Sequence, residues 1–186
     1  YPLRESSSAQ YMIPAGDQLG EADACAQMLL AEGKTPAQVA LQLDRYRQLR
    51  LQFPRTGDLF TDTIKPLCVQ LGRTVVTTYM NRSSHQETIQ IIKQLLAKDA
   101  PVMLVRKGKT VILDTIETDA RGTWLTIWHP GTGSQVRIRD HLEFWNGDDR
   151  TRTVTPTPSD LILEDIRLIT IEHDHRLRHL RTIAAT

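Results

Sequence analysis

Four short segments rich in β-branched and apolar residues follow one another in the second half of the chain. They are residues 102–105, 111–116, 124–128 and 135–139. Turn-forming residues separate them, among them Lys107-Gly108 and Gly131-Thr-Gly133. Strands joined by such short connections pair with their neighbours in antiparallel fashion. The sequence therefore predicts an antiparallel meander, and one or two further strands are expected over residues 161–171.

The first half of the chain has mainly helical patterns. Helices are expected over residues 21–32, from Pro36 onward behind a Thr35 cap, over 59–71 and over 84–97, with one strand at 73–79 between them. The apolar residues of the second predicted helix are Val39, Leu41 and Leu43. A short helix is expected over 140–145. Helices segregated from strands indicate an α+β fold, with N-terminal helices packed on a C-terminal antiparallel sheet.

Composition excludes several classes of protein. Of 186 residues, 40% are hydrophobic and 24% are charged, which is enough for one sizeable core. Lys and Arg total 23 against 22 Asp and Glu, so the charge gives no indication of a nucleic-acid partner. No apolar run approaches the roughly 20 residues of a membrane-spanning helix, so we expect no membrane insertion. Two cysteines, Cys25 and Cys68, leave the cellular compartment undetermined.

Proline and serine content suggests where the domain begins and ends. Residues 1–15 are expected to be an extended lead-in, because prolines and a triple serine interrupt them. Residues 16–150 form the predicted domain. Residues 151–186 are expected to be a C-terminal extension that carries the late strand or strands and a basic, His-rich tail.

Three stretches in this order match a known pattern. They are Gln18 with Ala26-Gln-Met-Leu-Leu30 and Gly33, then Ala100-Pro-Val-Met-Leu-Val105, then Trp128-His-Pro-Gly-Thr-Gly133 followed by Phe144-Trp145. Over roughly residues 16–148 the chain resembles the C39-like branch of the papain-like cysteine peptidases, which are bacterial domains. The resemblance implies a papain-like fold, with helices first and a sheet after them.

The resemblance also implies where catalytic residues would lie. A thiol peptidase needs a thiolate at a helix N-terminus, an imidazole, a group that orients the imidazole, and an oxyanion donor. Here the nucleophile position falls at Glu21, the imidazole position at about Thr110 and the orienting position at His129, while Gln18 retains the oxyanion donor. These degenerate positions imply a catalytically inactive domain that binds a peptide or protein partner without a cofactor or metal.

Two of these residues also have ordinary interpretations. Glu21 can simply supply a favourable negative charge at a helix start, and His129 can be a partly exposed turn residue. Two other functions stay open. The chain can be an active thiol hydrolase (peptidase, deamidase or acyl transferase) with Cys25 as nucleophile beside His85, His129 or His141. It can also be a scaffold subunit that docks through its terminal segments.

The two cysteines and the C-terminal tail also have ordinary interpretations. Cys25 lies among small and apolar residues, which is typical of packing, and Cys68 is predicted to be core. His175 and His179 are spaced as a helical metal pair would be. Interleaved arginines oppose a cation there, so the tail is interpreted as a solvated or partner-binding basic terminus.

Overall fold

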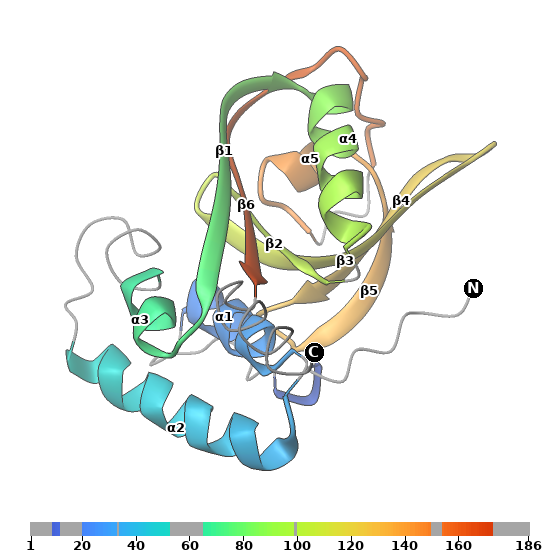
Figure 1. Cartoon of the computed structure of the whole chain (residues 1–186). Helices are drawn as coiled ribbons and strands as arrows, with labels where there is room; N and C mark the ends of the chain where they lie inside the picture. The colour runs from blue at the N-terminus through green and yellow to red at the C-terminus, as the bar shows by residue number, and fades with distance from the viewer. Residues whose placement is uncertain are drawn as a thin grey trace, which may run out of the picture. The chain divides into compact units, whose positions relative to one another are not determined.

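A computed structural model describes residues 9–11, 20–32, 34–52, 65–98, 100–149 and 154–172 (Figure 1). The chain divides into two compact units. Unit 1 consists of Tyr1–Glu32 and Thr77–Thr170, and unit 2 consists of Gly33–Val76 and Ile171–Thr186. The predicted domain boundary at residue 150 therefore falls inside unit 1.

The fold is α+β, with a six-stranded antiparallel sheet in the order β1-β6-β2-β3-β4-β5. The strands are β1 (Thr74–Ser84), β2 (Val102–Arg106), β3 (Lys109–Asp119), β4 (Gly122–His129), β5 (Ser134–Arg139) and β6 (Ile162–Glu172). The helices are η1 (Ala9–Tyr11), α1 (Glu21–Ala31), α2 (Pro36–Gln52), α3 (Lys65–Gln70), α4 (His85–Leu96) and α5 (Leu142–Trp145). The predicted meander corresponds to β2–β5, and the strand predicted at 73–79 continues to Ser84.

The late strand is part of the sheet rather than an appendage to it. β6 lies between β1 and β2 and pairs with β2 from Arg106↔Ile166 to Met103↔Ile169. Its side chains Leu163, Ile166 and Leu168 belong to the hydrophobic core. The expectation of a C-terminal extension outside the domain thus differs from the structure for residues 162–170, while the tail from residue 173 lies outside the described residues.

The β2–β3 hairpin turns through two residues, Lys107 and Gly108. Their φ angles are 46° and 76°, both positive, as a type I′ turn requires. This turn matches the twist of the two strands, and it places Arg106 opposite Lys109. The residues on either side of the turn are consequently held in fixed register.

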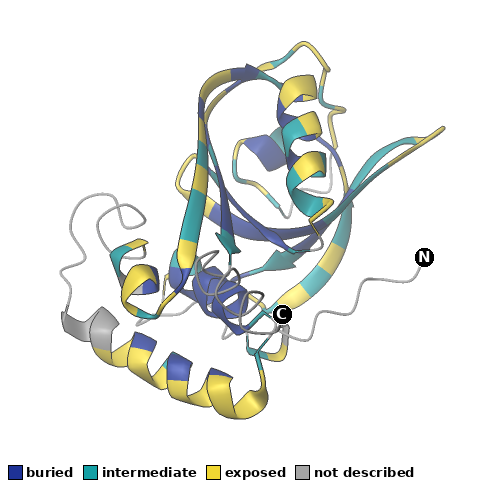
Figure 2. Cartoon of the chain, viewed as in Figure 1, coloured by how far each residue is buried: buried dark blue, intermediate teal, exposed yellow. Residues whose placement is uncertain are grey.

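The sheet of unit 1 is covered on both faces. On one face α4 and α5 pack on a core that includes Leu104, Leu113 and Ile127 (Figure 2). Ser84 caps α4 by accepting from the Glu87 N–H. Met103, paired with both Ile112 and Ile169, lies on the opposite face, because cross-strand partners share a face. There α1 packs against β2 and β3.

Unit 2 contains the second and third predicted helices. Thr35 and Gln38 form a reciprocal capping box at the start of α2, as the sequence predicts for Thr35. Val39 is buried, but Leu41, another apolar residue of this helix, is 75% exposed. Leu41 lies two positions from Val39, and helical periodicity turns it toward the opposite side. In α3 Cys68 is buried, as predicted. Residues 59–64 of the predicted third helix lie outside the described residues.

Candidate functional site

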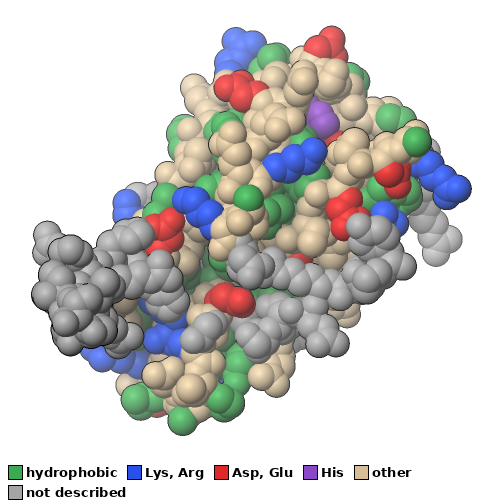
Figure 3. Space-filling view, turned by 45° about the vertical axis from the view of Figure 1, so that its right-hand side comes forward, with side chains coloured by type: hydrophobic (Ala, Val, Ile, Leu, Met, Phe, Trp, Pro, Cys, Tyr) green, Lys and Arg blue, Asp and Glu red, His purple; other side chains and the backbone are tan. Residues whose placement is uncertain are grey.

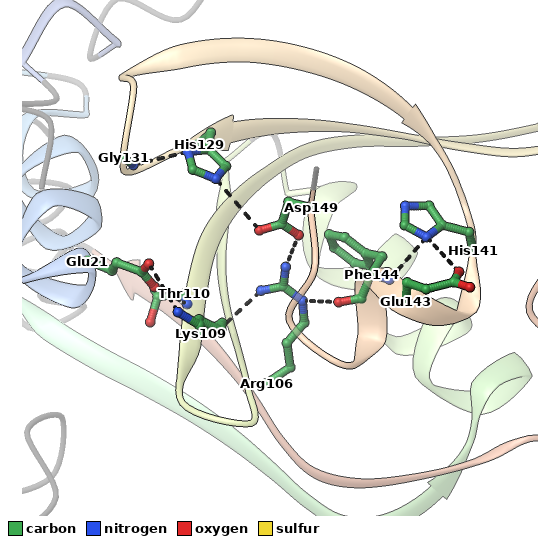
Figure 4. Close-up of polar contacts among 10 residues, drawn as sticks. All are labelled: Glu21, Arg106, Lys109, Thr110, His129, Gly131, His141, Glu143, Phe144 and Asp149. Carbon is green, nitrogen blue, oxygen red and sulfur yellow. Dashed lines mark hydrogen bonds and ion pairs between the residues drawn. The ribbon is translucent and has the colours of Figure 1, made fainter. Parts of the chain in front are cut away.

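Glu21 and Thr110, which are 89 positions apart, meet in unit 1 (Figure 4). Glu21 is the first residue of α1, and its Oε2 accepts a hydrogen bond from the Thr110 backbone N–H at 3.2 Å. The Nζ atom of Lys109 lies 4.0 Å from Glu21 Oε1. The helix start and the type I′ turn together bring these groups into contact, and the carboxylate has a cation beside it.

His129 is the last residue of β4. Since Ile112 pairs with Trp128, His129 lies across from the beginning of β3. Its Nδ1 accepts the Gly131 backbone N–H at 3.1 Å, so the proton of the neutral ring is on Nε2. That atom lies 4.0 Å from Asp149 Oδ2. The imidazole is thereby oriented by a turn on one side and a carboxylate on the other.

A buried guanidinium connects these two groups of residues. Arg106 is fully buried, and its Nη2 binds Asp149 Oδ1. Its Nε donates to the Phe144 carbonyl at 2.6 Å, and its Nη1 donates to the Lys109 carbonyl at 3.4 Å. The guanidinium also lies over the Phe144 ring at 4.2 Å. Arg106 thus links the hairpin, α5 and Asp149, and a buried charge with this many partners is a fixed part of the fold.

Sequence reasoning overlooked both Arg106 and Asp149. The available signal was a charged residue at the end of the otherwise apolar run 102–105. Strand periodicity alone cannot identify its partner, because Asp149 is 43 positions away. The sequence did select Glu21, Thr110 and His129. A continuous set of contacts through Lys109, Arg106 and Asp149 brings these three into one neighbourhood.

Cys25 lies one turn of helix after Glu21 and is fully buried. Burial raises the pKa of its thiol far above the ordinary range, the negative charge of Glu21 raises it further, and Arg106 opposes both. A nucleophilic cysteine needs the reverse shift and access to substrate. The geometry therefore favours packing over catalysis for Cys25.

Two of the imidazoles considered for Cys25 have partners elsewhere. His85 Nε2 lies 2.6 Å from Asp140 Oδ2, and the other oxygen of Asp140 accepts from the Trp145 indole N–H. His141 caps α5 by accepting the Phe144 backbone N–H at Nδ1. These two histidines stabilise the connections to α4 and α5.

Glu143 lies in α5, next to the helix-capping His141. Its own backbone N–H lowers its pKa to about 2, with further contributions from groups of Thr155 and His141. It is therefore ionised throughout the neutral and mildly acidic range.

Other expected residues remain outside this description. Gln18, His175 and His179 lie outside the described residues. Within the described part of the chain, no group of three or more His, Cys, Asp or Glu side chains is arranged to hold a metal ion. Among the same residues, no helix is long and apolar enough to cross a membrane. Comparison of the chain with protein-family models, curated proteins and solved structures finds no match in any of the three.

Proposed function

We propose that this chain is a papain-like domain of the C39-like type that binds an extended peptide or protein segment and does not cleave it. The observation that carries the proposal is the meeting of Glu21 with Thr110 at 3.2 Å, with His129 at the adjacent strand end. These are the positions at which the resemblance would require a thiol, an imidazole and an orienting carboxylate.

The residue types argue against acyl transfer. The Glu21 carboxylate is a weak nucleophile toward an amide, and its oxygens have a backbone N–H and a lysine as neighbours. Thr110 has no ring nitrogen that could move a proton between the attacking and leaving groups. The Nε2–H of His129 is directed toward Asp149, as orientation by a carboxylate requires, but no thiol is described beside it.

The same groups can bind a peptide, because they can form hydrogen bonds with a polypeptide backbone. Glu21 is about one-third exposed and can accept a peptide N–H. The His129 Nε2 atom lies 4.0 Å from Asp149 Oδ2, which is too long for a hydrogen bond, so its N–H can donate to a peptide carbonyl. Extended segments are commonly held by such main-chain hydrogen bonds, with side-chain pockets that add specificity. The proposed ligand is therefore an extended peptide segment.

A peptide array tests this proposal. The protein is incubated with immobilised 15-residue peptides and, in solution, with the peptides that bind; mass spectrometry monitors those peptides for cleavage. We expect binding without cleavage, and about tenfold weaker binding by Glu21→Ala combined with His129→Ala. Arg82→Ala is the matched control, since Arg82 is exposed and belongs to another surface pair.

Two results would contradict the proposal. One is peptide cleavage that disappears in Cys25→Ala, which would support the thiol hydrolase. The other is unchanged binding by the Glu21 and His129 variants together with loss of binding on deletion of residues 173–186, which would support the scaffold alternative. The deletion begins after β6, because removal from residue 151 would take away a central strand.

A further inference from the structure

A cavity of about 280 Å³ lies elsewhere in unit 1, between α5, the β2–β3 turn and the first half of β6. Its apolar wall includes Leu142 and Trp145 from α5 and Leu163 and Ile166 from β6. Lys107 lies at its edge. The volume is at the lower end of the range for small-molecule sites, so the cavity suits a ligand about the size of one amino acid.

The cavity lies where the β2–β6 ladder ends. The β2–β6 ladder runs up to the pair Arg106↔Ile166. The next two residues, Lys107 and Asp165, have φ angles of 46° and 60°, and they are the two non-glycine residues with positive φ in the described part of the chain. The φ of Lys107 belongs to the type I′ hairpin turn, whereas that of Asp165 interrupts the extended conformation of β6.

Asp165, which lies within β6, has a contact with the neighbouring strand β1. The Tyr79 hydroxyl donates to Asp165 Oδ1 at 2.9 Å, and the Arg167 guanidinium lies 5.4 Å from the centre of the Tyr79 ring. These contacts tie Asp165 and Arg167 of β6 to Tyr79 of β1.

The charges at the cavity favour an anion. Lys107 is exposed and is the one cation among the lining residues. The one lining carboxylate, Glu164, lies 3.8 Å from the Arg82 guanidinium, which offsets its charge. Acidic and basic side chains are interspersed over the face drawn in Figure 3.

We propose that this cavity binds an apolar carboxylate, with the apolar group against Trp145, Leu142 and Leu163 and the carboxylate beside Lys107 Nζ. A free aliphatic acid and the C-terminal residue of a peptide share this chemistry. The proposal does not depend on the Glu21 site, because none of the residues that contact Glu21 lines the cavity.

NMR titration of the isotope-labelled protein tests it with two pairs of probes. Octanoate is compared with octanol, and N-acetyl-L-phenylalanine is compared with its neutral amide. We expect saturable shifts at the Trp145 indole N–H and the Leu142 amide, with at least one acid binding about three- to fivefold more tightly than its neutral partner. Binding of octanoate alone would identify a free acid, and binding of the acetylated amino acid alone would identify a peptide C-terminus.

Two variants remove or oppose the charge while the fold is kept. Lys107→Asn suits the left-handed turn and should reduce acid binding to the level of the neutral probe. Ile162→Glu, at a half-exposed lining residue, should weaken acids more than neutral probes. Lys98→Asn, at an exposed position after α4, should change nothing. Equal binding of acid and neutral probes, no shifts at Trp145, or full acid binding by Lys107→Asn would overturn the proposal.

Discussion

The two halves of the candidate site are built differently. On the α1 side, Glu21 is about one-third exposed and has a hydrogen bond of 3.2 Å to Thr110 and a lysine 4.0 Å away. On the hairpin side, Arg106 is fully buried and binds a carboxylate, two backbone carbonyls and an aromatic face. The first half can be changed with little effect on folding, whereas the second half is part of the framework.

This difference indicates where function can vary. A buried guanidinium that loses its partner leaves an uncompensated charge, so Arg106 and Asp149 can change only together. A half-exposed carboxylate has water as an alternative partner, so position 21 can hold different chemistry on the same backbone.

The largest effect is expected for Arg106. Arg106→Met should lower the free energy of unfolding by about 3–5 kcal/mol, because Asp149 would be left buried and without its cation. Chemical denaturation measures this change. Arg82→Met is the control, and it should cost less than about 1 kcal/mol, since its pair with Glu164 is some 70% exposed. Equal losses in the two variants would contradict the assignment of Arg106 to the framework.

A second, pH-dependent effect is expected from the buried thiols. Burial raises the pKa of Cys25 well above its ordinary value of 9.0 and that of Cys68 to about 12. The folded state disfavours the thiolate. The neutral thiols therefore favour the folded protein fully below pH 9, and this contribution to stability is lost as the pH rises toward the thiol pKa values of the folded state. Each thiol should reduce the free energy of unfolding by about 1.4 kcal/mol per pH unit in that range.

Denaturation at pH 8 to 11 checks this expectation. The Cys25→Ala, Cys68→Ala double variant should lack that part of the slope while it keeps the contribution of lysines and tyrosines. The same slope in both proteins would show that the thiols ionise freely in the folded state, and it would favour Cys25 as a nucleophile.

The smallest effect is expected where α5 ends against the hairpin. Gly147 has a φ of 90°, and a Cβ there would lie 2.6 Å from Lys109 Cγ. Gly147→Ala should therefore destabilise more than Gly108→Ala, by about 1 kcal/mol, because Gly108 also has positive φ but nothing within 4 Å of its Cβ position. Thermal unfolding compares the two, and equal costs would mean that the α5 end does not restrain Lys109.

Much of the fold was accessible from the sequence because its signals are local. The Thr35 cap, the helix over residues 84–97, the Lys107-Gly108 turn and the meander each depend on neighbouring residues. The place of β6 between β1 and β2 was not accessible, because strand order depends on contacts that are distant in sequence. For the same reason the sequence indicated Glu21, Thr110 and His129 only through a resemblance and did not indicate the Arg106–Asp149 pair at all.

One measurement tests the central claim that position 21 and position 110 form a thiol-peptidase framework without its reactive groups. The pH dependence of iodoacetamide alkylation gives the pKa of the thiol introduced by Glu21→Cys. It is measured in the single variant Glu21→Cys and in the double variant Glu21→Cys, Thr110→His. The unsubstituted protein gives the background reaction of the two buried cysteines. We expect the added imidazole to lower that pKa by about one unit or more. The same thiol pKa in the single and double variants would contradict it.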